Sequence, residues 1–426
     1  MKLPSWIKKP KYEDSIATLP ATICDILNVK ALLGRPRLQR KLANVDIDDI
    51  NKVVLYVVDS FGYNLFNSMK LELRKFGFPS YLFSPLLSVF PSTTTTAVTT
   101  LMTGYTPQEH GLIGYMLFLK EYGVIVDMIR LSPVYSKGSN VLIDFGLDPQ
   151  KFLGVNTLHK ILTNQGIENY IFIKKIYKDS GLSKILHTNG QVIPHLSLSD
   201  LYVQLRKMLE NKKGEAAYFY MYWDSVDSLS HQYTAMSEEN KAEVLNVFLM
   251  LKEEVINKLD PEVAKETLII IVGDHGQSYV NKSNLVITNT HQRLLDMLDL
   301  PPTGETRVSY LYVKDSMEDD VIDYFERKFP DRFYIMRSKD ALKRGFFGIG
   351  TPKEGLMDRI GDLIVLPKPG SGIIHLYEQR ELEWERRGSH GGLTSDEMNV
   401  TLMISKFSEL QKNSRRKTNS SSEMNY

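Results

Sequence analysis

The 426-residue sequence has a single cysteine, Cys24, which excludes an intramolecular disulfide and any cysteine-based metal cluster. It also has almost no net charge, formally +1, whereas a dedicated nucleic-acid-binding protein usually carries a strong basic excess. No apolar run reaches membrane-spanning length, and the basic stretch 1–12 is not followed by the apolar core of a secretory signal. These absences predict a cytoplasmic protein without a transmembrane segment or a nucleic-acid-binding signature.

What the sequence does have is an ordinary globular composition, 42% hydrophobic and 24% charged, with enough length for one large α/β domain. Short apolar runs bounded by turn or charged residues alternate with helical patterns, which predicts a mostly parallel central sheet with helices on both faces. The expected strands are 52–59, 216–224, 267–274, 307–315, 362–367 and 398–405. The expected helices are 95–102, 156–164, 199–211, 237–259, 288–298 and 318–328.

Three parts of the chain are expected from these patterns. Residues 1–45 are predicted to form a basic, solvated N-terminal arm, and residues 46–410 the globular domain. Weaker periodicity within 105–215 and 300–385 indicates cap segments inserted over the sheet. Residues 411–426 are polar and are predicted to be a disordered tail.

Carboxylates and histidines follow several of the expected strands. Asp59, Asp224 and Asp274 each end a strand, and ligands of open α/β sheets bind beyond the carboxyl ends of strands. His275 comes directly after Asp274, and His390 lies in the glycine-rich stretch GSHGG before the last strand. Histidine and carboxylate without thiolate suit zinc or another first-row divalent ion, although a single Asp-His pair is more often a structural hydrogen-bonded pair than a ligand set.

A further carboxylate and histidine lie in the stretch DSVDSLSH. Asp227 and His231 are four residues apart, so a helical turn places both side chains on one face. The histidines outside these segments are expected to be structural: His159, His187, His195, His291 and His375.

The stretch FPSTTTTAVTTLMTG contains seven threonines at the start of an expected helix, although threonine is a mediocre helix former. Threonine hydroxyls cap helix ends, and a helix N-terminus also binds phosphate. The residues of this stretch alone leave both explanations open.

Together, five segments in this order resemble the type I phosphodiesterase/nucleotide pyrophosphatase family of the alkaline phosphatase superfamily: VVLYVVDSFG, FPSTTTTAVTTLMTGYTPQEHG, DSLSH, GDHG and SHGG. The resemblance covers about residues 52–405. It implies an alkaline-phosphatase-like fold and a site for two divalent metal ions. Zinc is the expected metal, with manganese or iron as alternatives.

The resemblance also implies roles for individual residues. One ion would be bound by Asp59, Asp274 and His275 together with the nucleophile, and the other by Asp227, His231 and His390. In nucleotide pyrophosphatases the catalytic threonine lies nine residues before the threonine of a Thr-Gly pair. Here that pair is Thr103-Gly104, so the position matches Thr94, with Thr93 and Thr95 as competitors. Asp224 would then cap the loop or support a ligand.

The match departs from the family at one position. Animal-type members have an asparagine twenty-one residues after the nucleophile, and it holds a phosphoryl oxygen. This chain has Tyr115 there, and a tyrosine hydroxyl could donate a similar hydrogen bond from a longer and stiffer side chain.

The implied activity is hydrolysis of a phosphodiester or pyrophosphate bond in a small phosphate ester or nucleotide, through a covalent phospho-threonine intermediate. Coordination to a divalent cation lowers the pKa of a hydroxyl and so activates it as a nucleophile. A phosphomonoesterase, a phosphonate hydrolase and an inactive homologue that binds a metal or nucleotide are the alternatives. The oligomeric state does not follow from the sequence.

Overall fold

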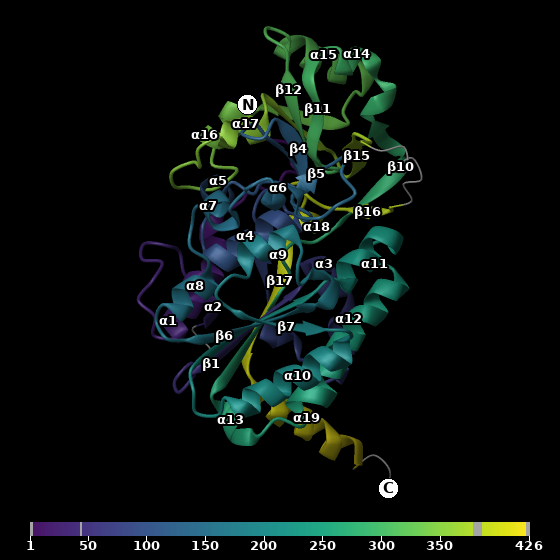
Figure 1. The fold of residues 1–426 in the computed structure, drawn as a ribbon. Helices are drawn as coiled ribbons and strands as arrows, with labels where there is room; N and C mark the ends of the chain where they lie inside the picture. Colours follow the sequence, from purple (N-terminus) through teal and green to yellow (C-terminus); the bar gives the residue numbers. More distant parts are fainter. Residues whose placement is uncertain (1–2, 43–44, 378–385, 423–426) are drawn as a thin grey trace.

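The computed structural model describes residues 3–42, 45–377 and 386–422. Within these residues the central sheet has seven strands in the order β2-β17-β9-β1-β8-β6-β7 (Figure 1). Their bounds are β1 Lys52–Val58, β2 Phe83–Leu87, β6 Glu168–Lys174, β7 Gln191–His195, β8 Ala217–Trp223, β9 Thr267–Val272 and β17 Asn399–Lys406. The strands β9, β1, β8, β6 and β7 are parallel, which confirms the predicted mostly parallel sheet.

The sheet is buried on both faces. Successive side chains of β1 point to opposite faces, so Val53 and Leu55 join one hydrophobic cluster whereas Val54 and Tyr56 join another. The helices α1, α4, α8 and α9 pack on the first face, and α3, α10 and α12 pack on the second (Figure 1). Their bounds are α1 Leu19–Ile26, α3 Tyr63–Lys75, α4 Thr94–Thr103, α8 Leu158–Thr163, α9 Gly181–Leu186, α10 Leu198–Asn211 and α12 Glu238–Leu251.

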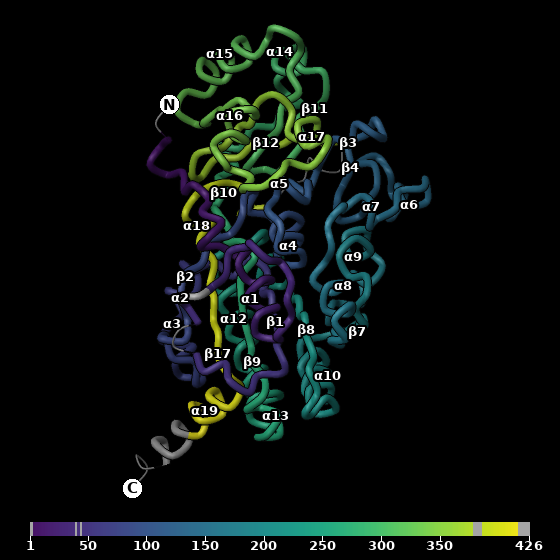
Figure 2. Tube along the Cα trace, turned by 90° about the vertical axis from the view of Figure 1, so that its left-hand side faces the viewer, coloured from purple at the N-terminus to yellow at the C-terminus, as the bar shows by residue number. Residues whose placement is uncertain are grey.

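A second, largely antiparallel sheet lies above the carboxyl ends of the central strands (Figures 1 and 2). Its seven strands, again counted over the described residues, have the order β13-β14-β12-β11-β3-β4-β5. They are β3 Met116–Leu119, β4 Val124–Asp127, β5 Ser132–Pro133, β11 Leu298–Glu305, β12 Val308–Val313, β13 Phe333–Arg337 and β14 Leu363–Pro367. A small sheet of β10 (Ser278–Ile287), β15 (Gly370–Ile374) and β16 (Gly388–Ser389) has the order β15-β10-β16.

Three of the runs predicted to be parallel strands do form strands, but these strands pair antiparallel with their neighbours. The runs 307–315 and 362–367 form β12 and β14, which pair antiparallel in the second sheet. The run 398–405 forms β17, which belongs to the central sheet but pairs antiparallel with both β9 and β2. An apolar run shows that a strand is buried, but it does not identify the strand's partner or direction.

The expected helices agree better with the structure. Helices α4, α8, α10 and α15 (Glu318–Lys328) fill the ranges predicted for them, within two residues at the ends. The range 237–259 contains α12 followed by a π-helical turn at Lys252–Ile256. The range 288–298 contains only a 3₁₀ turn (Thr288–Thr290) and the short α14 (Gln292–Leu295), and β11 begins at its last residue.

Over the residues that the structure describes, both terminal segments pack against the domain, contrary to the prediction of a solvated arm and a disordered tail; residues 423–426 of that tail lie outside the described residues. In the first segment Ile16, Leu19 and Ile23 are fully buried in the cluster on the α4 face of the sheet. At the other end, α19 spans Phe407–Ser422, and the Gln411 side-chain amide donates to the backbone oxygens of Ile256 and Leu259 at 3.0 and 2.8 Å. These contacts with distant segments order residues whose local composition is polar.

Short helices complete the described structure. They are α2 Gln39–Leu42, α5 Pro107–His110, α6 Val141–Asp144, α7 Pro149–Leu153, α11 Ser225–Tyr233, α13 Pro261–Lys265, α16 Ser338–Lys343, α17 Leu356–Ile360 and α18 Ser395–Met398. No helix in the described ranges has the length and apolar character needed to cross a membrane.

Candidate active site

The threonine-rich segment forms the buried helix α4, which ends at Gly104 with φ of 74°. Most of its hydroxyls are used inside the protein. The Thr99 hydroxyl donates to the backbone oxygen of Thr95 at 2.6 Å, and the Thr103 hydroxyl donates to that of Thr99 at 2.7 Å. Such bonds let a threonine be buried in a helix without an unsatisfied hydroxyl. They account for part of the excess of threonine.

Thr94 is the first residue of α4, and its hydroxyl faces a cluster of acidic and imidazole groups. Thr94 Oγ1 lies 3.2 Å from His275 Nε2 and 3.4 Å from Asp59 Oδ2. The Thr93 hydroxyl instead donates to Glu305 Oε1 at 2.7 Å, and the Thr95 hydroxyl is buried. Of the three candidate nucleophiles, Thr94 is thus the one placed against predicted metal ligands.

Asp59 and Asp274 follow the neighbouring parallel strands β1 and β9, so their side chains meet at one edge of the sheet. His275 Nε2 lies 3.2 Å from Asp59 Oδ1 and 3.6 Å from Asp274 Oδ2. The turn after His275 requires glycine, because a Cβ on Gly276 would lie 2.0 Å from the backbone oxygen of Asp396. Tight contact between the two loops therefore fixes the position of His275.

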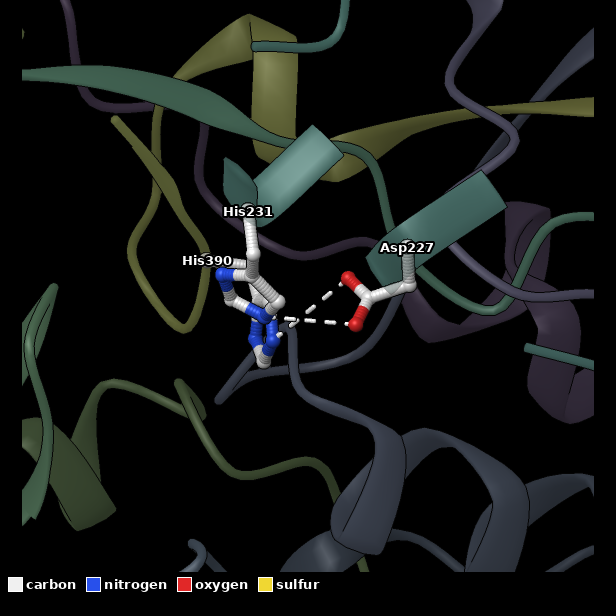
Figure 3. Close-up of side chains that lie close together, drawn as sticks. All are labelled: Asp227, His231 and His390. Atoms are coloured by element: carbon white, nitrogen blue, oxygen red, sulfur yellow. Dashed lines mark ion pairs between the residues drawn. The ribbon is translucent and has the colours of Figure 1, made fainter. Parts of the chain in front are cut away.

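The second group consists of Asp227, His231 and His390 (Figure 3). Asp227 and His231 lie one turn apart on α11, with His231 Nε2 3.2 Å from Asp227 Oδ2. His390 directly follows β16, whose pairing with β10 places it here, with Nε2 3.8 Å from Asp227 Oδ1. The His390 ring stacks on His275 at a centroid distance of 3.9 Å. The two groups of predicted ligands therefore form one continuous site.

Hydrogen bonds to backbone oxygens orient two of the imidazoles. His231 Nδ1 lies 2.8 Å from the oxygen of Gly388, and His275 Nδ1 lies 2.9 Å from that of Gly276. A carbonyl can only accept, so each Nδ1 carries the proton and each Nε2 has its lone pair free. Metal-ligating histidines commonly have this arrangement.

The residues of the site fit divalent cations. Asp59 Oδ1, Asp274 Oδ2 and His390 Nδ1 are buried without a hydrogen-bond partner within the described ranges, and buried polar atoms normally have one. Burial raises the pKa of Asp59 well above its usual range, and the carboxylates of Asp274 and Asp227 raise it further. A bound cation would compensate both the crowded carboxylates and the unpaired atoms.

Asp227 has a different electrostatic environment. Burial alone would raise the pKa of its carboxyl, but the facing imidazoles of His231 and His390 hold that pKa below its usual range. Burial also lowers the pKa of His390 well below its usual value, and the adjacent His275 adds to this effect. A neutral imidazole is the form that binds a metal.

Two neighbouring side chains that sequence reasoning missed hold these carboxylates. The hydroxyl of Tyr222, on β8, donates to Asp59 Oδ2, and the Gln277 amide donates to Asp227 Oδ1 at 2.8 Å. Gln277 lies two residues beyond His275, so its proximity could have drawn attention to it. No sequence signal relates Tyr222 to Asp59, because their contact depends on the pairing of β1 with β8.

Asp224 does not belong to the group formed by Asp227, His231 and His390. Its carboxylate forms an ion pair with Lys174 and accepts a hydrogen bond from the Tyr177 hydroxyl. These partners occupy a carboxylate that could otherwise compete for a cation. The predicted loop-capping role is not seen, since its side chain makes no capping bond to α11.

Tyr115 lies near the nucleophile turn, but its hydroxyl donates to Asp127 Oδ2 at 2.8 Å. Its backbone N–H donates to Glu305 Oε1, also at 2.8 Å. A phenol has one proton to donate. A hydrogen bond from this hydroxyl to a phosphoryl oxygen would require Tyr115 to give up Asp127, and that role stays a prediction.

The histidines expected to be structural make contacts typical of that role. His159 Nδ1 lies 2.9 Å from Asn169 Oδ1, and His375 Nδ1 lies 2.8 Å from the Thr288 hydroxyl. The remaining three pack against aromatic side chains: His187 on Tyr220, His195 on Trp223 and His291 on Phe329.

Comparison with known proteins gives one family match. A model of the family "Type I phosphodiesterase / nucleotide pyrophosphatase" matches residues 53–393, which is most of the chain. That range contains Thr94 and all six predicted metal ligands. A search of the curated proteins found no match.

Solved structures share the fold at low sequence identity. A structure of murine ectonucleotide pyrophosphatase/phosphodiesterase 5 superposes with a TM-score of 0.58 at 16% identity, covering 83% of this chain and 88% of that one. An inactive variant of the murine protein in complex with AMP gives 0.59 at 15% identity, with 87% and 95% covered. The human protein gives 0.59 at 16% identity, with 83% and 87% covered.

Proposed function

Because the chain belongs to the type I phosphodiesterase/nucleotide pyrophosphatase family and is therefore a hydrolase of phosphoric ester bonds, we propose that it uses Thr94 to cleave a phosphodiester or pyrophosphate bond. One observation carries the proposal: the Thr94 hydroxyl lies within 3.4 Å of both Asp59 and His275, at the edge of a single Asp/His cluster. No other threonine of the run has this environment within the described structure.

Two divalent ions, with zinc as the first candidate and manganese or iron as alternatives, suit this donor set. Asp59, Asp274 and His275 would hold one ion beside Thr94, and the other would be held by Asp227, His231 and His390. When bound, such ions lower the pKa of a hydroxyl or water and neutralise charge on phosphoryl oxygens.

The chain's own groups supply position and polarity. Thr94 begins a ten-residue helix, and a helix N-terminus favours the negative charge of a phosphoryl group. The Thr94 hydroxyl loses its proton to solvent and the Oγ1–P bond forms. The P–O bond to the leaving group breaks, and the leaving oxygen keeps the electron pair and takes up a proton from solvent. Water then cleaves the phospho-threonine, releases the product phosphate ester and restores the hydroxyl.

A nucleotide is the favoured substrate class, because a structural neighbour of the same fold was solved with AMP. Phosphomonoesterase and phosphonate hydrolase activities are the alternatives within the superfamily. An inactive homologue is disfavoured, because the predicted ligands and the hydroxyl lie together.

The test is an assay of the purified protein with bis-p-nitrophenyl phosphate and p-nitrophenyl phosphate, alongside metal analysis. We expect two equivalents of metal and faster turnover of the diester. Thr94→Ala should remove the activity while metal stays bound. Thr99→Val, which removes a hydroxyl from the same helix away from the cluster, is the matched control. Full activity of Thr94→Ala would exclude Thr94 as the nucleophile and leave Thr93 and Thr95 as candidates.

A further inference from the structure

Glu305 places a carboxylate beside the nucleophile turn. It is the last residue of β11 and belongs to the second sheet. Its Oε1 accepts hydrogen bonds from the hydroxyl of Thr93 at 2.7 Å and from the backbone N–H of Tyr115 at 2.8 Å. Glu305 therefore contacts the residue directly before Thr94.

The same side chain also contacts the loop that carries His390. A Cβ on Gly391 would lie 2.8 Å from Glu305 Cβ and 3.0 Å from its Cγ, so the backbone there packs directly on the glutamate. Three segments of the site thus meet at the Glu305 side chain: the nucleophile turn and the segment at Tyr115 at its carboxylate, and the His390 loop at its Cβ and Cγ. This convergence places Glu305 at the rim of the reaction centre.

Burial dominates the electrostatic environment of the Glu305 carboxyl. Burial raises the pKa of its carboxyl to about 7, while the hydrogen bonds from Thr93 and Tyr115 and the nearby charge of Arg386 lower it. Arg386 is exposed to solvent, so water screens it. Above that pKa the carboxylate therefore adds negative potential close to Thr94.

We propose that Glu305 is a specificity-determining residue that disfavours dianionic phosphate monoesters relative to monoanionic phosphodiesters at the Thr94 site. Coulomb repulsion is proportional to the product of the charges, so a dianion is repelled about twice as strongly as a monoanion. The inference rests on the proposed function, because it assumes that a phosphoryl group binds beside Thr94. It explains how a cluster able to accept either ester class prefers one.

The hydrogen bond to Thr93 gives Glu305 a second, positioning effect, which variants can separate from its charge. Glu305→Gln removes the charge and retains an oxygen that can accept from Thr93 and Tyr115. Glu305→Asp retains the charge on a side chain that is one carbon shorter. Glu266→Gln is the matched control, since it neutralises a glutamate that is paired with Lys52 at the opposite end of β1.

The first measurement is kcat/KM of the zinc-loaded protein for p-nitrophenyl phosphate and bis-p-nitrophenyl phosphate at about pH 8.5, where the Glu305 carboxyl is ionised. In Glu305→Gln the monoester-to-diester ratio should rise about tenfold, the order expected for removing one nearby charge. In Glu305→Asp both rates should fall while the ratio stays constant, and Glu266→Gln should leave the ratio unchanged. An unchanged ratio in a folded Glu305→Gln protein would overturn the proposal.

A second measurement does not require turnover. Inorganic phosphate, titrated calorimetrically into the zinc-loaded protein, should bind about tenfold more tightly to Glu305→Gln than to wild type. If neither ester is hydrolysed but phosphate binding tightens in this way, the proposed activity is wrong and the role of Glu305 stands. If diesters are hydrolysed but neither the ratio nor phosphate binding changes, the role of Glu305 is wrong and the activity stands. Glu305→Ala removes the same charge and replaces the glutamine variant if that variant does not fold.

Discussion

Replacement of Arg307 by methionine should both destabilise the protein and weaken its metal site. Arg307 is fully buried, and its guanidinium lies 3.0 and 3.2 Å from the two carboxylate oxygens of Glu397. Glu397 in turn accepts from the backbone N–H of Gly392 and from both the N–H and the hydroxyl of Thr394. The pair therefore holds the loop that directly follows His390.

The expected loss of stability follows from the Glu397 carboxylate, which Arg307→Met leaves buried without its partner. Removing one partner of a buried ion pair leaves the other charge unpaired in a poorly solvated place, and this typically costs about 3–5 kcal/mol. Arg307→Met should lower the free energy of unfolding by that amount in the metal-free protein, measured by urea denaturation. Because Gly392 lies two residues from His390, zinc affinity measured by competition with a chelator should also fall.

Two further variants test the reasoning. The double variant Arg307→Met/Glu397→Leu removes both charges, so it should recover much of the stability, but the loop loses its hydrogen bonds and zinc affinity should stay low. Arg337→Met, which breaks an exposed pair with Glu318, should change neither quantity measurably. A loss below about 1 kcal/mol in Arg307→Met, with zinc affinity kept, would refute the role assigned to the pair.

The remaining predictions concern Tyr222, which contacts the predicted metal ligand Asp59, and the buried His159. Tyr222→Phe removes the hydroxyl that donates to Asp59. Loss of such a supporting hydrogen bond should weaken zinc binding about 10–100-fold, measured by the same competition with a chelator. An unchanged zinc affinity would contradict the supporting role of Tyr222. Burial lowers the pKa of His159 to about 4, so below about pH 6.5 the unfolded chain binds a proton that the folded protein does not. Stability should therefore fall as the pH drops from about 6.5 to 4, by up to about 1.4 kcal/mol per pH unit from this group, and urea midpoints of His159→Gln should show a smaller dependence. Equal slopes for the two proteins would contradict the assignment.

The residues predicted as metal ligands could be expected to lie together because each belongs to a short segment whose local geometry is set by its own sequence. Asp59 and Asp274 follow strands that are mostly apolar, and Asp227 and His231 have the spacing of one helical turn. The edge at which parallel strands end then brings these segments together. Family membership, shown by the match over residues 53–393, confirms the resemblance on which the grouping relied.

The predictions that were wrong, and the residue that the sequence did not reveal, depend on contacts between distant segments. The run 307–315 is as apolar as the central strands, but as β12 it pairs with β11 and β14 in the second sheet. Ile16, Leu19 and Ile23 do have helical spacing, but that spacing does not show what these side chains pack against. Glu305 could not be found from the sequence, since its partner Thr93 lies 212 positions away.

The two sheets have different effects on the site. The predicted metal ligands Asp59, Asp227, Asp274 and His275 lie at the carboxyl edge of the central sheet or in the loops and helix that follow it. The turn between β11 and β12 instead approaches from the second sheet: Glu305 contacts the nucleophile turn, and Arg307 holds Glu397 below the His390 loop. Substitutions in this turn can therefore alter charge selection and loop position without replacing a metal ligand.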